Sequence, residues 1–251
     1  MTFLVELEAP PRAVLGCIQV GTDFVLDCEG PALIALFPGV EIRLQKIPLI
    51  DLKISTNVLR ASAIEIPYGV SALQPIDRCT IIGLACTSFA ITLGESVVDE
   101  LLKRAATPIT VTTDMARAQV RAIKTLGARK VALLTPYIEE VSLANSNMLE
   151  QAGIRVISRI TMELDRDELS SRVNKNTIIE WAKRVNTSEA EVIVIGCSAL
   201  RVCSKDGFID TLEEEIGKPV VTSTQAFMWD MLRNAGVSDQ VPGYGELFLH
   251  H

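Results

Sequence analysis

Two cysteines stand at matching places in the chain and are the residues best suited to chemistry. Cys86 ends an apolar run that begins at Ile81, and Cys197 ends a second apolar run that begins at Val192. Each cysteine is followed by a small hydroxyl residue. Short apolar runs are typical of buried strands in a parallel sheet, and ligands bind just beyond the carboxyl ends of such strands. The pattern therefore predicts two similar halves that each deliver one thiol to a site.

A place at the start of a helix favours reactivity in a thiol. We expect Cys86 and Cys197 each to lie at a turn from strand to helix, where exposed N–H groups and the helix dipole lower a thiol pKa. One such cysteine alone is as well explained as a small buried hydrophobe, but the matched pair favours function. The remaining cysteines have no such placement and are interpreted as structural: Cys17, Cys28, Cys79 and Cys203.

The sequence leaves little room for metal or histidine chemistry. The only histidines are His250 and His251 at the end of the chain, and no Cys-x-x-Cys pair occurs. We therefore expect neither a metal site nor a histidine base. Proton transfer is left to cysteine, tyrosine, carboxylates, lysine or water. The chain is also too long to depend on a disulfide framework.

Apolar runs alternate with helical periodicities along the whole chain. Such alternation predicts parallel sheets, helices on both faces and right-handed crossovers. We place an N-terminal α/β lobe at residues 1–112 and a C-terminal α/β lobe at residues 113–222, with the helix in residues 223–251 packing back onto the first lobe. The two sheets are expected to be related by pseudo-two-fold symmetry, with Cys86 and Cys197 facing each other across the cleft between the lobes.

Local signals predict individual elements. Thr22 or Asp23 is expected to cap a helix that runs to about Phe37 and is broken or kinked at Gly30 and Pro31. Other elements are predicted as follows: strands at residues 77–85 and 108–111, and helices at residues 113–126, 139–151, 208–216 and 223–234.

Charge and hydropathy exclude several partners. The formal net charge of -7 makes nucleic acid or an anionic membrane surface an unfavourable partner. No apolar run reaches about 18 residues, the length that a membrane helix needs. Residues 1–11 carry two glutamates and no basic cluster ahead of an apolar core, so they do not resemble a secretory signal. We therefore expect a cytoplasmic protein.

Five stretches together resemble the aspartate/glutamate racemase superfamily, and most closely its maleate isomerase and arylmalonate decarboxylase branch. The two cysteine motifs, at residues 83–88 and 196–201, carry most of the resemblance. Three further stretches agree in order and spacing: residues 131–140, Trp229 with Asp230, and residues 242–248. The resemblance covers nearly the whole chain. It implies two Rossmann-like lobes with the active site between them and no cofactor.

The same resemblance implies a function for both cysteines. Racemases of this superfamily use two cysteines as acid and base on opposite faces of a carbon, whereas maleate isomerases use the first cysteine as a nucleophile. Arylmalonate decarboxylases keep only the second, so the presence of both Cys86 and Cys197 favours an isomerase or a racemase. The implied substrate is a small carboxylate, and the family favours a homo-oligomer. A decarboxylase-like enzyme is an alternative.

Substrate-binding residues also follow from the resemblance. Tyr137 falls on the tyrosine that contacts a substrate carboxylate in the isomerases. Backbone N–H groups of four residues are expected to hold that carboxylate: Thr87, Ser88, Ser198 and Ala199.

Two aspartates depart from the maleate isomerase pattern, which has asparagine at both places. Asp23 follows the first predicted strand, and Asp167 falls near the second asparagine. An ionised carboxylate only accepts hydrogen bonds and repels a second carboxylate. Asp23 either holds an ammonium or amide group of the substrate or caps a helix without a ligand role.

With aspartate at position 23, the chain resembles the ectoine-utilisation proteins of the EutA type. We therefore predict that a nitrogen-containing carboxylate is preferred over maleate. The alternative from another class is a binding or regulatory protein that keeps the cleft and lacks turnover.

Overall fold

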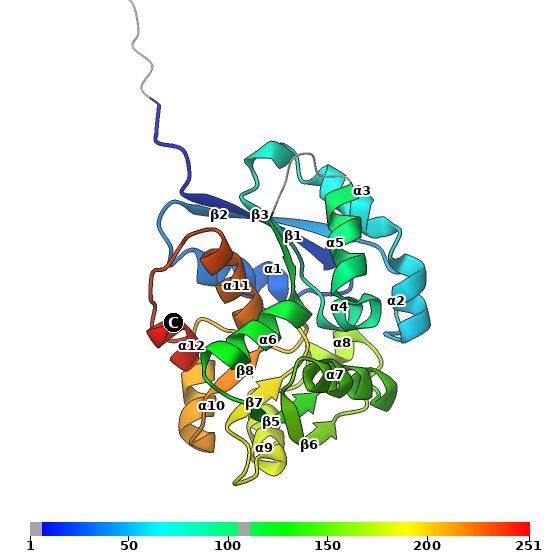
Figure 1. The fold of residues 1–251 in the computed structure, drawn as a ribbon, viewed down its shortest axis with the longest axis vertical. Helices are drawn as coiled ribbons and strands as arrows, with labels where there is room; N and C mark the ends of the chain where they lie inside the picture. Colours follow the sequence, from blue (N-terminus) through cyan, green and yellow to red (C-terminus); the bar gives the residue numbers. More distant parts are fainter. Residues whose placement is uncertain (1–6, 105–110) are drawn as a thin grey trace, which may run out of the picture.

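The structure is a computed structural model that describes residues 7–104 and 111–251. Within these residues it contains two four-stranded parallel sheets, with the orders β2-β1-β3-β4 and β6-β5-β7-β8 (Figure 1). The two lobes therefore share one topology, and the predicted α/β fold with two related parallel sheets is confirmed. The strands are β1 (Ala13–Val20), β2 (Val40–Ile47), β3 (Ile81–Leu84), β4 (Thr112–Asp114), β5 (Lys130–Thr135), β6 (Arg155–Thr161), β7 (Val192–Ile195) and β8 (Val220–Thr222).

The strands that lead to the two cysteines lie inside their sheets. β3 and β7 are buried along their whole length, and so is the neighbouring β1. Burial on both faces explains why these strands read as continuous apolar runs in the sequence. The edge strand β2 is mostly half-buried instead. The carboxyl ends of β3 and β7 are thus held rigidly in the interior of the protein.

Helices cover both faces of the first sheet. Leu15 and Cys17 of β1 share a hydrophobic cluster with α1, whereas Val14 and Ile18 share another with α3 and α5. The helices between β1 and β4 are α1 (Leu26–Ile34), α2 (Thr56–Ser62), α3 (Glu65–Ala72), α4 (Thr87–Leu93) and α5 (Glu95–Arg104).

The helix after β1 is continuous, so the predicted break at Gly30 and Pro31 is wrong. α1 runs through Pro31, with buried apolar residues on both sides of it. This packing outweighs the one backbone hydrogen bond that proline removes. The capping prediction is confirmed, because Asp23 Oδ1 accepts the N–H groups of Val25 at 2.9 Å and Leu26 at 3.1 Å.

One predicted strand needs correction, and a second is not tested. The segment at residues 77–85 forms a strand only over β3, because a short 3-10 helix, η1 (Ile76–Arg78), precedes it. The strand predicted at residues 108–111 lies largely outside the described residues, and β4 follows it. β4 ends where Asp114 accepts the Arg117 N–H at 2.9 Å, so helix α6 (Met115–Thr125) begins two residues later than predicted.

The second lobe follows its predicted elements closely. Its helices are α7 (Glu139–Gln151), α8 (Asp167–Ser170), α9 (Lys175–Val185), α10 (Phe208–Ile216), α11 (Ser223–Asn234) and α12 (Gly245–His250). The bounds of α7, α10 and α11 coincide with the predicted segments. The short helix α12 was not predicted.

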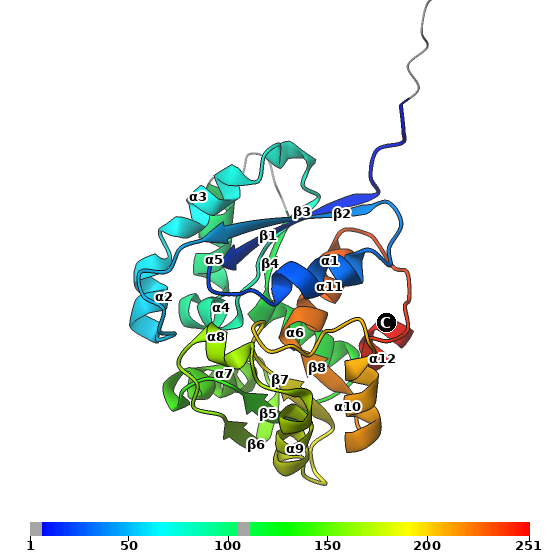
Figure 2. The ribbon, with the colours of Figure 1, turned by 180° about the vertical axis from the view of Figure 1, so that it is seen from behind.

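Helix α11 packs against the first lobe. α11 lies along α6 and contacts α1, β1 and β3 (Figure 2). Gly83 in β3 makes this approach possible, because a Cβ atom there would lie 2.6 Å from the ring of Phe227. The largest hydrophobic cluster accordingly contains residues of both sheets. The two lobes therefore share one core.

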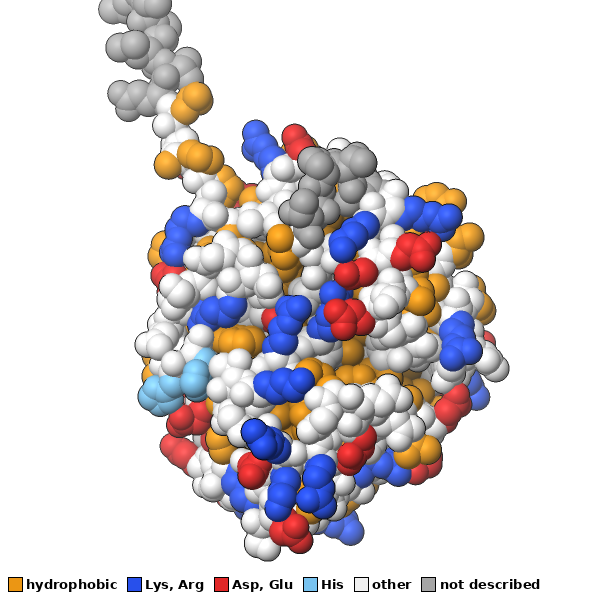
Figure 3. All heavy atoms as spheres, in the orientation of Figure 1, with side chains coloured by type: hydrophobic (Ala, Val, Ile, Leu, Met, Phe, Trp, Pro, Cys, Tyr) orange, Lys and Arg blue, Asp and Glu red, His pale blue; other side chains and the backbone are white. Residues whose placement is uncertain are grey.

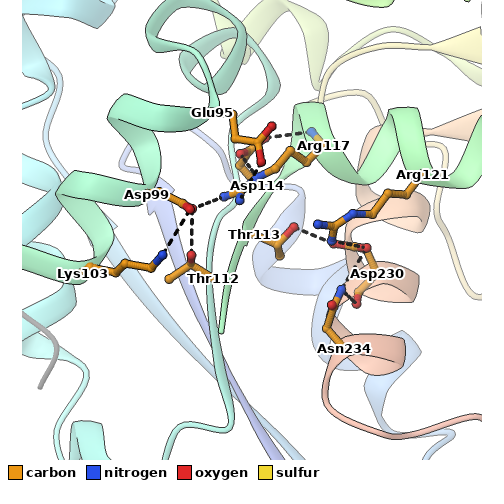
Figure 4. A network of polar contacts seen from close by, with 10 residues as sticks. All are labelled: Glu95, Asp99, Lys103, Thr112, Thr113, Asp114, Arg117, Arg121, Asp230 and Asn234. Carbon is orange, nitrogen blue, oxygen red and sulfur yellow. Dashed lines mark hydrogen bonds and ion pairs between the residues drawn. The ribbon is translucent and has the colours of Figure 1, made fainter. Parts of the chain in front are cut away.

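A buried carboxylate fastens α11 at this place. Asp230 accepts hydrogen bonds from Thr113 at 2.5 Å and from Arg121 at 2.9 Å, and Asn234 contacts it at 3.0 Å (Figure 4). These partners lie on β4, α6 and α11. Buried polar groups that are fully paired favour one arrangement over others, so this network fixes how the two lobes sit together.

Acidic and basic side chains are interspersed on the face of the molecule seen in Figure 3, so no patch of a single charge sign forms there. Among the helices that the structure describes, none combines the length and the apolar character needed to cross a bilayer.

Candidate active site

Cys86 lies where β3 gives way to α4, as predicted. It is the N-cap residue of α4 and has extended backbone angles, with φ at -152° and ψ at 113°. Thr87 and Ser88 are the first two residues of the helix, so their N–H groups have no acceptor within it. The Cys86 sulfur lies 3.5 Å from the Ser88 hydroxyl oxygen. The side chain is buried, and the charge of Asp167, from the second lobe, acts on its thiol.

Cys197 follows β7 by a different route. Its φ of 103° lies in the left-handed region, which residues with a Cβ atom rarely adopt. No helix starts here: the chain makes turns, and α10 begins only at Phe208, so the predicted strand-to-helix turn is wrong at Cys197. The reason is burial, because Leu200, Val202 and Cys203 all enter the core from this short segment.

The turns after Cys197 are held by the first lobe. Glu29 of α1 is buried and accepts the N–H of Cys203 at 3.1 Å. Burial raises the pKa of Asp23, and the hydroxyl of Ser198 beside it acts in the opposite direction. The Cys197 N–H donates to the hydroxyl of Ser223 at 2.8 Å. The loop of the second cysteine is therefore built partly from contacts that cross between the lobes.

Tyr137 completes the group around the thiols. It follows β5, is buried, and lies close enough to Cys197 for the phenol and the thiol to shift each other's pKa. Burial raises the pKa of Tyr137 well above its usual value, and the nearby thiols Cys197 and Cys86 raise it further. The phenol is therefore a neutral hydrogen-bond donor at neutral pH.

The surroundings of both thiols favour the protonated form. Burial raises the pKa of Cys86 to about 12, and the carboxylate of Asp167 adds to this rise. Hydrogen bonds from Ser88 and from the Phe89 N–H act in the opposite direction but are outweighed. The pKa of Cys197 is likewise raised, first by burial and then by Asp167 and Asp23. The expected lowering by a helix N-terminus is thus overcome by desolvation.

Two aspartates flank both thiols. Asp23 is fully buried and, besides its capping bonds, has an Oδ2 atom with no hydrogen-bond partner among the described residues. Asp167 accepts a hydrogen bond from the Thr22 hydroxyl at 2.5 Å. Burial raises the pKa of Asp167 to about 6, and the charge of Asp23 adds to the rise. Two carboxylates and two thiols thus share one buried region, in which every ionised form of these groups is negative.

A pocket of about 550 Å³ opens beside Thr22 and Asp167. Its other walls include the apolar side chains of Phe24, Leu49 and Leu52. Of the residues around the thiols, Asp167 is the one that also lines this pocket.

The site residues predicted from the sequence lie as follows: Cys86, Thr87 and Ser88 follow β3, Cys197, Ser198 and Ala199 follow β7, and Asp23, Tyr137 and Asp167 lie close enough to the thiols to affect or share their pKa shifts. Three polar residues were missed: Thr22, Gln119 and Ser223. Ser223 directly follows β8, so the rule that singled out the cysteines would also have found it. Gln119 lies within a helix and gives no such signal. Within the described residues, no group of His, Cys, Asp and Glu is arranged to hold a metal ion.

Comparison with known proteins finds relatives named maleate isomerase and arylmalonate decarboxylase. The model of the arylmalonate decarboxylase family matches residues 72–248. A maleate isomerase from Alcaligenes faecalis is 23% identical over 93% of this chain and 95% of its own length. An arylmalonate decarboxylase from Bordetella bronchiseptica is 30% identical over 58% of this chain and 60% of its own.

A solved structure has the same fold. It is a cysteine-to-serine mutant of the Nocardia farcinica maleate cis-trans isomerase with a covalently bound succinylcysteine intermediate. It is 22% identical, covers 95% of this chain and 99% of its own, and has a TM-score of 0.84.

Proposed function

This chain belongs to the arylmalonate decarboxylase family, and we propose that it is a cofactor-independent isomerase that uses two cysteines on a small carboxylate. The observation that carries the proposal is the convergence of Cys86 and Cys197, from opposite lobes, on one buried region beside Tyr137. Relatives named maleate isomerase match nearly the whole chain, which supports isomerase chemistry. A decarboxylase needs only one thiol, and this site has two.

Binding of the substrate carboxylate falls to groups that donate hydrogen bonds. The Tyr137 hydroxyl is a neutral donor, and the N–H groups of Thr87 and Ser88 have no acceptor within α4. We propose that the N–H groups of Ser198 and Ala199, which follow Cys197, add to this set from the other lobe. A carboxylate bound by these groups lies between the two sulfurs.

The two thiols then divide the reaction. The Cys86 thiolate, formed by loss of its proton to water or Asp167, adds to one carbon of the substrate double bond and forms a C–S bond. The electron pair of the double bond moves to the neighbouring carbon, which takes the proton of Cys197. Rotation about the resulting single bond follows. Cys197 then removes that proton again and Cys86 leaves, so that the double bond reforms in the other geometry. The succinylcysteine in the Nocardia farcinica isomerase supports the addition step.

In a racemase the same two groups would act without the addition. One thiolate would remove the proton at the α-carbon, and the other thiol would return one to the opposite face. General acid–base transfer of this kind contributes typically about 10²–10⁴-fold to the rate.

The charge of the site favours a substrate that carries nitrogen. Asp23 and Asp167 both raise the pKa of both thiols, so a further pair of carboxylates, as in maleate, would make thiolate formation harder still. An ammonium or amide group offers a donor to the unpartnered Oδ2 of Asp23. An ammonium would also lower the thiol pKa values by neutralising the aspartates. We therefore assign an amino acid or a related diamino acid derivative as the preferred class.

Location and assembly form part of this proposal. All six cysteines are free, which suits a reducing compartment such as the cytoplasm. We also propose a homo-oligomer, which light scattering coupled to size-exclusion chromatography would test against a monomer.

A substrate panel in deuterium oxide tests the function. Unsaturated diacids, amino acids and diamino acid derivatives would each be incubated with the protein and followed by proton NMR. Turnover of a nitrogen-bearing carboxylate, faster than that of maleate, is expected. Deuterium at the α-carbon of the product would identify a racemase, because a cis-trans isomerase need not exchange that position. Ligand-induced stabilisation without turnover across the panel would instead support a binding or regulatory protein and contradict the enzyme.

A further inference from the structure

Ser223 is a buried hydroxyl to which the sequence pattern and the proposed chemistry give no role. It is the first residue of α11 and is fully buried. Its oxygen lies 2.8 Å from the Cys197 nitrogen, 2.9 Å from Nε2 of Gln119 and 2.8 Å from the Thr87 hydroxyl oxygen. We propose that Ser223 is a positioning residue that holds Cys197 in its unusual backbone conformation and links it to the loop of Cys86.

The three contacts of Ser223 engage both lone pairs and the hydrogen of its hydroxyl. A serine hydroxyl has two acceptor lone pairs and one hydrogen. The Cys197 N–H can only donate, and the Gln119 amide takes the second lone pair. The hydrogen of Ser223 is then left for the Thr87 oxygen. Each of the three contacts therefore uses a different feature of the one hydroxyl, which fixes its orientation.

Cys197 needs such an anchor more than Cys86 does. Cys86 is the N-cap of a regular helix, and its carbonyl accepts the Ala90 N–H at 3.0 Å. Cys197 has a φ of 103°, and turns rather than a helix follow it. A residue with a Cβ atom keeps such a φ only when its surroundings impose it. The bond from the Cys197 N–H to Ser223 imposes it directly.

The four residues come from four elements that meet between the lobes. Thr87 opens α4, Gln119 lies in α6, Ser223 opens α11, and Cys197 ends the β7 segment. Thr87 is also the residue next to Cys86. Ser223 therefore sets the position of one thiol-bearing loop relative to the other, which two groups acting on opposite sides of one substrate require.

Alkylation of individual cysteines tests this placement without any substrate. Cys197 is 5% exposed, so iodoacetamide should modify it slowly in the folded protein. Trypsin cleavage after Arg201 separates Cys197 from Cys203, so mass spectrometry reads each rate by itself. In Ser223→Ala the loop relaxes, and alkylation of Cys197 should become about 10-fold faster, while that of Cys17 in the core of β1 should not change.

Turnover gives the second readout and rests on the proposed function. Ser223→Ala should lower kcat about 10–100-fold, since a small misplacement of a reacting group has effects of that size, and should change KM much less. Ser223→Thr, which keeps the hydroxyl, should restore most of kcat. If no substrate is found, the alkylation rates still decide the role of Ser223, so the two proposals fail separately.

A neighbouring residue provides the matched control. Thr224 is also buried on α11, but its hydroxyl has no partner among the described residues. Thr224→Val keeps the shape and should leave both readouts within about twofold of the wild type. Gln119→Met removes the amide that orients Ser223. It should change the alkylation rate and kcat in the same direction as Ser223→Ala does, but by a smaller factor. This variant replaces Ser223→Ala in the test if Ser223→Ala does not fold. An unchanged Cys197 alkylation rate in Ser223→Ala, or an equal change in Thr224→Val, would overturn the proposal.

Discussion

The two halves of the protein share a strand order, yet they present their cysteines in different ways. Cys86 caps a regular helix with ordinary backbone angles, whereas Cys197 has a positive φ and is followed by turns. The groups that favour the thiolate of Cys86 come from its own segment, namely the Ser88 hydroxyl and the Phe89 N–H. Cys197 depends on Ser223 and Tyr137, which other elements supply. A symmetric scaffold thus carries an asymmetric pair of thiols, and we infer that the two have different tasks.

Removal of either thiol should have the largest effect. Cys86→Ala and Cys197→Ala should each lower kcat by about 10²–10⁴-fold or more, because each takes away a group that forms a bond or moves a proton. Cys28→Ala is the matched control, since that thiol is exposed and outside the site. Steady-state kinetics on the substrate identified by the panel would measure this. Near-normal activity in either site variant would show that the cysteine replaced in it has no part in the reaction.

Exchange of one aspartate should change which substrate is used. Asp23→Asn replaces an ionisable acceptor near both thiols by an amide that can donate to a carboxylate. We expect kcat/KM for maleate to rise about tenfold relative to that for the nitrogen-bearing substrate. Asp27→Asn removes the same charge from α1 farther along the helix and should not alter the ratio. If the wild type already converts maleate efficiently and Asp23→Asn is no better, Asp23 is only a helix cap.

The contact between α1 and the Cys197 loop should make stability depend on pH. Glu29 is buried and accepts the Cys203 N–H, and burial raises its pKa to about 8 from a usual 4.5. Asp23 raises this pKa further, whereas Arg201 and Lys175 lower it. The folded state therefore binds more protons than the unfolded state between these two values. The stability contributed by protonated Glu29 is complete below about pH 4.5 and is lost as the pH rises through 8.

Glu29→Gln should abolish that part of the pH dependence. The amide keeps an oxygen for the Cys203 N–H and cannot ionise, so the variant should gain stability at pH 8 and gain little at pH 4.5. One pKa unit corresponds to about 1.4 kcal/mol, which sets an upper limit of about 5 kcal/mol on the gain. Chemical denaturation at both pH values would measure it. A variant that is less stable than the wild type at pH 8 would show that the ionised carboxylate is needed at this contact.

The sequence was sufficient for the parts of the fold that local signals control. The apolar runs of the buried strands β3 and β7 were recognised because burial on both faces leaves no other pattern, although the predicted start of β3 was four residues too early. Asp23 was recognised as a cap because its role depends on residues two and three positions ahead. The break predicted at Pro31 does not occur, since the packing of α1 against the core outweighs the local preference of proline to end a helix.

The site was predicted in its residues but not in its environment. The resemblance pointed to the thiols, Tyr137 and the aspartates, yet the raised pKa of Cys86 arises from burial between two lobes, which no local pattern reveals. The turns after Cys197 were missed because the helix rule that holds for Cys86 was applied to both halves. Their cause is tertiary, as the contact between Glu29 and Cys203 shows, because it joins residues that are far apart in the sequence.

Trapping of a covalent adduct tests most directly whether the two thiols have different tasks. Cys197→Ser and Cys86→Ser would each be incubated with maleate, an unsaturated diacid of the substrate panel, and intact mass followed by peptide mapping would locate any addition. We predict an increase by the mass of the substrate on Cys86 in Cys197→Ser, and none on Cys197 in Cys86→Ser. An adduct on Cys197, or equal adducts on both cysteines, would contradict the assignment of Cys86 as the nucleophile and Cys197 as the proton donor.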